Sequence, residues 1–366
     1  MTRDSPRDRQ SFAGRLIAWQ NQHGRHDLPW QKTQDPYRIW LSEIMLQQTQ
    51  VNTVIPYYAR FLDRFPDIET LAAAPVERVL ELWAGLGYYA RARNLHRCAQ
   101  AVVTGHGGRF PDSAEALTEL PGIGRSTAAA IAAFAFGQRT AILDGNVKRV
   151  LARCFGIEGF NGSAQSEKKL WTLAESLLPA KKIEAYTQGL MDLGATRCTR
   201  SKPFCTACPM HEICIARRTD RQAELPTARP KKIVPERETN VLLLTDGQRI
   251  LLERRPPSGI WGGLLALPEV ASDAAESFAR RHGCRIIDTQ FLPPLRHSFT
   301  HFRLTIHALH CTAQSTGRHA AEPGWEWLDL RDVEGAALPT PIRKLLRLLA
   351  GCAAKTAQTH RPAPAG

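Results

Sequence analysis

The stretch LPGIGRSTAAAIAAF, residues 120–134, predicts the architecture of the first half of the chain. A Leu120-Pro121 turn precedes Gly122 and Gly124, which stand immediately before an Ala-rich helical run. Glycines in this position expose backbone N–H groups at a helix N-terminus, which is a binding site for an anion. An ordinary tight turn between two packed helices is the alternative interpretation.

The charge of the chain favours the anion-binding interpretation. Its 366 residues include 48 Lys and Arg against 35 Asp and Glu, a formal net charge of +13, which indicates nucleic acid as the partner. We therefore interpret the turn as a helix-hairpin-helix that grips a DNA phosphate without reading base sequence. The longest apolar run, residues 128–137, is too short to span a bilayer, and the polar start is unlike a secretory signal. We expect a cytoplasmic protein without a membrane segment.

Four cysteines lie close together near the middle of the chain, separated by six, two and five residues: Cys198, Cys205, Cys208 and Cys214. The other five cysteines are scattered, which argues against a secreted disulfide framework. Four thiolates suit a four-iron cluster better than zinc, because only one gap has the length typical of zinc knuckles. Zinc and buried free thiols remain alternatives. Arg200 and Lys202 lie on the intervening loop, where a bound cluster would aim them at phosphates.

Two acidic residues stand in unusual surroundings. Glu43 shares a helical face with Trp40 and Gln47 and is followed by an uncharged polar run, which suits a pocket that reads hydrogen-bonding edges. Asp144 directly precedes a helical run. An exposed surface charge is the alternative for Glu43, and a helix N-cap is the alternative for Asp144.

The hydrophobic pattern changes along the chain. Residues 36–225 have the three- and four-residue spacing of helices, and the proline-rich basic stretch that follows has the composition of a linker. Beyond it, NVLLLTDGQRILLER indicates two strands around an Asp246-Gly247 turn, and FRLTIHALHC alternates as a half-buried strand does. The second part is therefore expected to combine strands and helices.

Five motifs together closely resemble MutY-type adenine DNA glycosylases, over most of residues 10–350: WLSEIMLQQTQV, LWAGLGYYARARNL, LPGIGRSTA, ILDGNVKRVLARC and the cysteine spacing. The resemblance implies a multidomain protein with an all-α helix-hairpin-helix core of the endonuclease III superfamily and a C-terminal α/β Nudix (MutT)-like domain. It implies a [4Fe-4S] cluster on the four cysteines. It also implies excision of adenine mispaired with 8-oxoguanine or guanine in double-stranded DNA, in base excision repair. We expect a monomer in the bacterial cytoplasm, associated with the nucleoid through DNA.

The resemblance and the composition together give expected domain boundaries. These are a disordered N-terminus (1–12), a helical iron-sulfur domain (13–35 and 141–225), a six-helix domain with the hairpin (36–140), a linker (226–237), a MutT-like domain for 8-oxoguanine recognition (238–352) and a disordered tail (353–366).

The chemistry requires an acid and a carboxylate. Adenine is a poor leaving group as an anion, so an acid must protonate its ring as the glycosidic bond stretches, and Glu43 suits that role if burial raises its pKa. The oxocarbenium-like sugar needs a nearby carboxylate, which Asp144 supplies in ionised form. Asn146 is expected to position Asp144 and the nucleotide.

Other residues are assigned to DNA through the resemblance. Tyr88 is expected to wedge into the duplex, with core packing as its alternative, and Gln48 to fill the vacated stack. Adenine-pocket residues are Leu28, Trp30 and Gln188, and phosphate contacts are Gly122, Gly124, Ser126, Arg200 and Lys202. The segment Phe299-Thr300-His301 is expected to inspect 8-oxoguanine, unless it is only the end of a strand.

Two departures from related families refine the expected activity. Ser126 occupies the position of the catalytic Lys in bifunctional relatives, so no Schiff base forms there and a monofunctional glycosylase is expected. In the Nudix box Gly263 and Glu269 are retained, but the expected Arg and Glu positions hold Ser277, Phe278, Arg281 and His282, which removes hydrolase chemistry. The competing hypotheses are an endonuclease III-like pyrimidine glycosylase with lyase activity and a non-catalytic, metal-stabilised DNA-binding module.

Overall fold

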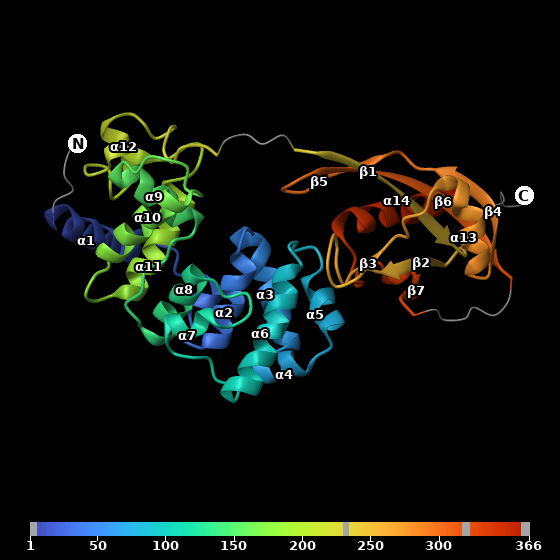
Figure 1. The fold of residues 1–366 in the computed structure, drawn as a ribbon, viewed down its shortest axis with the longest axis horizontal. Helices are drawn as coiled ribbons and strands as arrows, with labels where there is room; N and C mark the ends of the chain where they lie inside the picture. Colours follow the sequence, from blue (N-terminus) through green and yellow to red (C-terminus); the bar gives the residue numbers. More distant parts are fainter. Residues whose placement is uncertain (1–5, 230–233, 317–322, 360–366) are drawn as a thin grey trace, which may run out of the picture. The chain divides into compact units, whose positions relative to one another are not determined.

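The computed structural model describes residues 6–229, 234–316 and 323–359 (Figure 1). The chain divides into two compact units. The first unit comprises residues 1–73 and 94–231, and the second comprises residues 74–93 and 232–366. Among the described residues, no helix is both long and apolar enough to cross a membrane.

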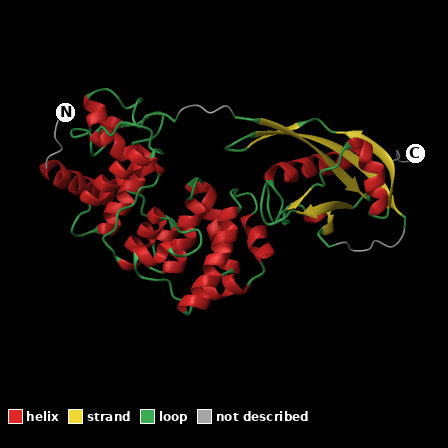
Figure 2. Cartoon of the chain, viewed as in Figure 1, coloured by secondary structure: helices red, strands yellow, loops and turns green. Residues whose placement is uncertain are grey.

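The first unit is built from helices (Figure 2). They are α1 (Pro6–His23), η1 (Pro29–Gln31), α2 (Pro36–Leu46), α3 (Val51–Arg64), α4 (Ile68–Ala73), most of α6 (Ala90–His106), α7 (Ala114–Thr118), α8 (Arg125–Phe136), α9 (Gly145–Phe155), α10 (Ala164–Ser176), α11 (Ile183–Asp192), η2 (Leu193–Arg197), η3 (Cys205–Ala207) and α12 (Ile215–Arg218).

Helices α7 and α8 form the predicted helical pair around the glycine turn. Gly122 adopts a φ of +80°, and a Cβ there would lie 2.7 Å from the Cβ of Asn94, so both backbone conformation and space favour glycine. Helix α8 begins after Gly124 and ends at Gly137, whose left-handed φ of 65° terminates the helix. The six alanines and Ile131 that follow Thr127 allow close packing of α8 against α2 and α7.

The core of the first unit joins segments that are distant in sequence. Phe12 and Leu16 of α1 are fully buried and belong to one cluster with Val150 of α9 and Leu190 of α11. Each such side chain contributes about 1.5–3 kcal/mol to the stability of the fold. This packing holds the N-terminus of α9, where Asp144 lies, beside α11, which carries Gln188.

The second unit contains a mixed sheet with the strand order β3-β2-β1-β6-β4, in which β5 also pairs with β6 and β7 with β2. Strands β1 and β6 are parallel, and the other pairs are antiparallel. The strands are β1 (Glu236–Thr245), β2 (Arg249–Arg254), β3 (Leu265–Ala266), β4 (Cys284–Phe291), β5 (Leu295–Ser298), β6 (Arg303–Ser315) and β7 (Trp325–Asp329). The unit also contains α5 (Val76–Trp83), η4 (Ser272–Ala274), α13 (Ala275–Arg281), η5 (Leu330–Asp332) and α14 (Thr340–Thr359).

Alternation along β1 buries both faces of the sheet. Val241 and Leu243 pack in the cluster that contains Leu345 of α14, whereas Leu242 and Leu244 pack in the cluster that contains Phe278 of α13. The predicted Asp246-Gly247 turn connects β1 and β2, and Gly247 has a φ of 92°. The predicted combination of a helical part and an α/β part is confirmed.

Both ends of the chain contain more helix than expected. Helix α1 begins at Pro6 and α14 continues to Thr359, so both extend into the segments 1–12 and 353–366 that were expected to be disordered. The apolar stretch PIRKLLRLLAG, residues 341–351, lies within α14. The alanines that follow it permit helix, although the Pro and polar residues of the tail indicate disorder.

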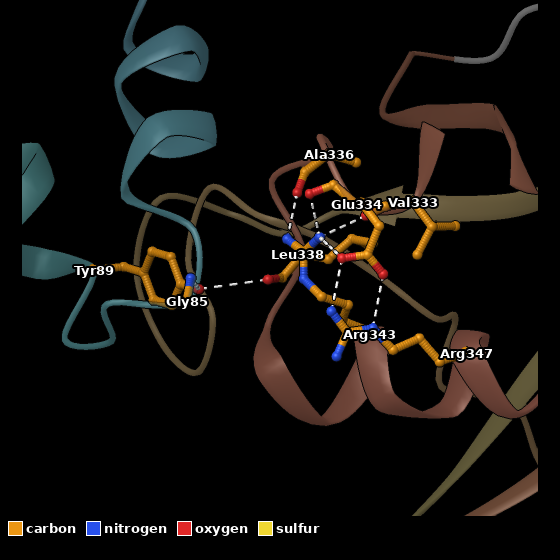
Figure 3. A network of polar contacts seen from close by, with 8 residues as sticks. All are labelled: Gly85, Tyr89, Val333, Glu334, Ala336, Leu338, Arg343 and Arg347. Carbon is orange, nitrogen blue, oxygen red and sulfur yellow. Dashed lines mark hydrogen bonds and ion pairs between the residues drawn. The ribbon is translucent and has the colours of Figure 1, made fainter. Parts of the chain in front are cut away.

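One arginine, Arg343, binds the backbone carbonyls of the loop before α14 (Figure 3). Arg343 is almost fully buried and donates to the carbonyl oxygens of Val333, Glu334 and Ala336 at 2.5–2.8 Å. Arg347, one turn later, is exposed and pairs with the Glu334 carboxylate. In the same unit, the Tyr89 hydroxyl accepts from the N–H of Gly85 and donates to the carbonyl of Leu338.

Candidate functional site

An open cleft in the first unit contains many of the predicted residues. Its empty space, including the part open to solvent, is about 3290 Å³, and its walls come from the α1–α2 connection and from α2, α8, α9 and α11. Eight of the predicted residues line it: Leu28, Trp30, Glu43, Gln48, Ser126, Asp144, Asn146 and Gln188.

Glu43 projects from α2 into this cleft. Burial raises the pKa of its carboxyl to about 8, and the nearby charge of Asp144 contributes to the increase. Within the described part of the chain, no hydrogen bond holds this carboxyl. Glu43 is therefore mostly protonated at neutral pH and can act as a proton donor, which the alternative of an exposed surface charge does not provide.

Asp144 is both the N-cap of α9 and a residue of the cleft. Its Oδ1 accepts from the N–H of Val147 at 2.7 Å, and the N–H of Asn146 also stabilises the carboxylate. Burial raises the pKa of Asp144, while these N–H groups and the nearby Arg149 and Lys148 oppose that increase. The N-cap and the functional interpretations are therefore compatible, because the same oxygens cap the helix and face the cleft.

Asn146 is held by Arg149, which sequence analysis did not single out. Nη2 of Arg149 donates to Oδ1 of Asn146 at 2.8 Å and to the carbonyl of Gly194 at 2.7 Å, and Nε donates to the carbonyl of Cys198 at 2.7 Å. A Cβ on Gly194 would lie 2.5 Å from the Cβ of Asn146, so glycine is required for this close approach. One guanidinium thus connects the cleft with the cysteine-rich loop.

Gln188 is oriented by a buried ion pair that the sequence did not reveal. Asp192 is fully buried and accepts from the backbone N–H and Nε of Arg25, at 2.9 and 2.7 Å. Oδ1 of Asp192 also accepts from Nε2 of Gln188 at 2.8 Å. One of the two amide N–H groups of Gln188 is used in this way, which orients the amide, and Oε1 is available as an acceptor. The four-residue spacing of Gln188 and Asp192 on one helix is the only signal that was available beforehand.

Of the five predicted phosphate contacts, four are exposed and one lines the cleft. Gly122 and Gly124 are exposed at the N-terminus of α8, and Arg200 and Lys202 are exposed on the loop between the first two cysteines. Ser126 differs, because it lies in the cleft and its Oγ accepts from the backbone N–H of Leu143 at 2.9 Å.

The four cysteines line one pocket, together with buried Cys154. None of them is in a disulfide, and the pocket has an empty space of about 390 Å³. No three His, Cys, Asp or Glu side chains in the described ranges are arranged to hold a metal ion, so the sulfurs line a space instead of converging on one point. Arg153 is buried beside them and donates to Sγ of Cys198 at 3.4 Å and to the carbonyls of Thr199, Arg200 and Leu225.

Tyr88 belongs to the second unit and is 46% exposed, which excludes the core-packing alternative. Its φ is +50°, a left-handed conformation that is rare for a non-glycine residue. The Arg91 guanidinium lies 5.4 Å from the Tyr88 ring and donates to the carbonyl of Gly87 at 3.2 Å. The loop therefore holds an aromatic ring outward in a strained conformation. Gln48 in the cleft is also exposed, with a φ of 56°.

The segment Phe299-Thr300-His301 forms the tip between β5 and β6. The Phe299 ring stacks on Phe302 with a centroid separation of 4.4 Å, and the Phe299 N–H donates to the Phe302 carbonyl at 2.9 Å. Phe299 is half-buried, whereas Thr300 and His301 are exposed. The two polar side chains, not the aromatic ring, are the accessible groups of this tip.

In the described part of the second unit, the altered Nudix box contains no group of three His, Cys, Asp or Glu side chains arranged to hold a metal ion. Arg255 lies between two acids, with Nη1 at 3.1 Å from Glu269 and 3.7 Å from Glu253. His282 packs on Phe278 and Trp325, with ring centroids 4.5 and 4.6 Å away. Arg255 thus forms an ion pair with the retained Glu269.

Comparisons with known proteins agree with both units. Residues 41–176 match the HhH-GPD superfamily base excision DNA repair protein family, and residues 240–348 match the NUDIX domain family. A solved thermostable thymine-DNA glycosylase is 33% identical, with a TM-score of 0.54 over 58% of this chain and 98% of its own. An endonuclease III bound non-covalently to DNA, 19% identical, has the same helical fold, with a TM-score of 0.51 over 60% of this chain and 99% of its own.

Full-length relatives give the most specific comparison. An adenine DNA glycosylase of Buchnera aphidicola subsp. Baizongia pistaciae is 37% identical over 337 residues, which cover 92% of this chain and 95% of that protein. The adenine DNA glycosylase of Homo sapiens is 33% identical and covers 93% of this chain and 74% of its own. Both units, in the same order, lie within these alignments. The chain therefore belongs to the adenine DNA glycosylases of the HhH-GPD base excision repair superfamily.

Proposed function

We propose that this enzyme hydrolyses the N-glycosidic bond of adenine mispaired with 8-oxoguanine or guanine in double-stranded DNA. The observation that carries the proposal is the pair of carboxyls in one cleft, Glu43 and Asp144. Burial raises the pKa of both carboxyls, to about 8 for Glu43, which is then mostly protonated at neutral pH. At Asp144, N–H groups and cations oppose the increase and favour the ionised form, so we assign Glu43 as the acid and Asp144 as the stabilising carboxylate.

In the proposed reaction, Glu43 donates its proton to a ring nitrogen of the extruded adenine. The glycosidic bond breaks with its electron pair on the base, and the positive charge that develops on the sugar is stabilised by the Asp144 carboxylate. Water adds to C1′ of the sugar and loses a proton, which restores the Glu43 carboxyl. The products are free adenine and an abasic site.

Gln188 supports adenine over guanine as the substrate. The bond from Nε2 to Asp192 orients the amide, and its Oε1 can accept from the exocyclic amino group of adenine, which is a donor. Guanine has a carbonyl at the same ring position and would face this acceptor with another acceptor. The buried Leu28 and Trp30 supply apolar surface for the ring of the base.

Extrusion of adenine requires groups that enter the duplex and groups that hold its backbone. Unstacking costs a few kcal/mol, and Tyr88 and Gln48 are the proposed inserted residues, supported by their exposure and strained left-handed conformations. The exposed Gly122, Gly124, Arg200 and Lys202 are the proposed phosphate contacts. A Schiff-base lyase is disfavoured because Ser126 offers no amine in the cleft.

A [4Fe-4S] cluster fits the cysteine pocket. Its proposed ligands are Cys198, Cys205, Cys208 and Cys214, whose sulfurs line one space with the Arg153 guanidinium donating to Sγ of Cys198. When bound, the cluster cross-links the loop and performs no redox step in base removal. Arg153 stabilises thiolate charge at this position, and the exposed Arg200 and Lys202 are held on the loop that the ligands fix.

The tip of the second unit is the proposed reader of 8-oxoguanine. That base carries an N–H at N7 where guanine has an acceptor, so the hydroxyl or carbonyl of Thr300 can accept from the damaged base alone. The exposure of Thr300 and His301 supports this role, and the packing of Phe299 against Phe302 supports a bracing role for the ring. Arg255 beside Glu269 agrees with a domain that recognises the lesion without Nudix hydrolysis.

Replacement of Glu43 by Gln tests the proposed reaction. The change removes the acid but retains shape, so single-turnover excision of adenine opposite 8-oxoguanine should fall by about 10²–10⁴-fold while duplex binding stays near wild type. Glu184→Gln is the matched control, because Glu184 lies exposed in the same cleft and should keep normal activity. Near-normal turnover in Glu43→Gln would exclude Glu43 as the acid.

Iron analysis of purified protein tests the cofactor. We expect brown protein with about four irons per chain, and Cys205→Ser should lose most of this iron and its visible absorbance because one ligand is gone. Cys98→Ser should retain the iron, since Cys98 is buried elsewhere in the first unit. Stoichiometric zinc without visible absorbance would contradict the cluster assignment.

Thr300→Val tests the reader of the lesion. Loss of the hydroxyl acceptor should slow excision opposite 8-oxoguanine by about 10- to 100-fold, because an unmade buried hydrogen bond costs roughly 1–3 kcal/mol, with little change opposite guanine. Thr289→Val, at an exposed position of β4, provides the control. Equal slowing on both duplexes would show that the tip only holds DNA. No slowing on either duplex would show that the Thr300 hydroxyl does not read the lesion.

A further inference from the structure

Two adjacent hydroxyls at the start of α8 contact different walls of the cleft. Ser126 and Thr127 both line the cleft, and each side-chain oxygen accepts one hydrogen bond from a separate element. These two elements are the ones that carry Asp144 and Glu43. The pair is thus hydrogen-bonded to the two segments that carry these carboxyls, through Gln47 and Leu143.

Ser126 holds the segment that ends at Asp144. Leu143 is buried, and its N–H donates to Oγ of Ser126 at 2.9 Å. Three residues earlier, the hydroxyl of Thr140 donates to the carbonyl of Ala129, also on α8, at 3.1 Å. The extended segment therefore lies along α8, attached at both ends, and the Ser126 attachment is one residue from Asp144. Without an acceptor, the buried Leu143 N–H would be left unpaired, which favours a shift of the backbone beside Asp144.

Thr127 contacts the helix that carries Glu43. Its Oγ1 accepts from Nε2 of Gln47 at 3.3 Å, and Gln47 is one turn beyond Glu43 at the C-terminal end of α2. The C-terminal end of α2 is therefore attached to the same turn of α8 as the Asp144 segment. Helix α8 is rigid at this point, because the alanines that follow Thr127 are packed in the core.

We propose that Ser126 and Thr127 are positioning residues that fix the separation of the Glu43 and Asp144 carboxyls for adenine excision. The inference rests on the proposed function, because it concerns the geometry of the same reaction. The acid must reach the base while the carboxylate reaches the sugar, and a displacement of about 1 Å costs on the order of 10²-fold in rate. In this role the Ser126 hydroxyl binds the Leu143 N–H and is not required to contact a DNA phosphate.

The test compares isosteric and conservative variants with two separate readouts. Ser126→Ala and Thr127→Val remove the acceptors, whereas Ser126→Thr and Thr127→Ser retain them. The single-turnover rate at saturating enzyme measures chemistry on a duplex with adenine opposite 8-oxoguanine, and the Kd of the same duplex measures binding. The matched control is Ser163→Ala, which removes a serine oxygen that accepts the backbone N–H of Ser166 at the N-cap of α10, away from the cleft.

Ser126→Ala should lower the single-turnover rate by about 10- to 100-fold with less than about a twofold change in Kd, and Ser126→Thr should restore most of the rate. Thr127→Val should show a smaller loss of the same kind, because its bond is longer. Ser163→Ala should lower the melting temperature without lowering the rate.

Three results would overturn the inference. A normal rate in Ser126→Ala would show that the Leu143 contact does not control the carboxyls. A weaker Kd with a normal rate at saturation would make Ser126 a phosphate contact. Equal loss of rate in Ser126→Ala and Ser163→Ala would indicate general destabilisation. Absence of excision by the wild-type enzyme would instead contradict the proposed function.

Discussion

The Asp144 carboxyl accepts the N–H of Val147 at 2.7 Å, and the geometry of the first unit around the cleft depends on that cap. The bond begins α9, and one face of α9 then carries Arg149 and Arg153 four residues apart. Both guanidinium groups donate to carbonyls of the cysteine loop, at Cys198, Thr199 and Arg200. Because a buried arginine with several carbonyl partners cannot move without leaving those carbonyls unpaired, the loop and the cleft share one rigid helix.

The same cap supports the different roles proposed for the two nearby carboxyls. N–H groups at a helix N-terminus stabilise negative charge, so Asp144 has support for its ionised form that Glu43 lacks. Burial and the nearby Asp144 charge both raise the pKa of the Glu43 carboxyl. The proposed acid and the proposed carboxylate are similar side chains that differ in position, one near the C-terminal end of α2 and the other at the N-cap of α9.

Local signals in the sequence pointed to helices, to the cysteine cluster and to Glu43 and Asp144, whereas the family fold and the roles of Leu28, Trp30, Gln48 and Gln188 came from the resemblance to MutY-type glycosylases. Glycine spacing before α8, the cysteine gaps and the polar run after Glu43 are all visible within short windows, and the change of hydrophobic period located the second unit. The Arg25–Asp192 pair joins residues 167 positions apart, and the Leu143–Ser126 bond depends on how a segment lies along α8. Such partners have no sequence signature. The packing of the Phe299 ring against Phe302 likewise depends on the turn between β5 and β6, which no short stretch of sequence reveals.

The central claim is that one protonated and one ionised carboxyl act together in this cleft. The most direct test is the pH dependence of single-turnover adenine excision at saturating enzyme. Glu43 acts when it is protonated, so the rate should fall as the pH rises through about 8. Asp144 acts when it is ionised, so the rate should also fall at low pH, where the pH drops through the raised pKa of Asp144. The account predicts a bell-shaped profile whose alkaline limb is absent from the residual activity of Glu43→Gln. A wild-type rate that stays level or rises well above pH 8 would contradict it.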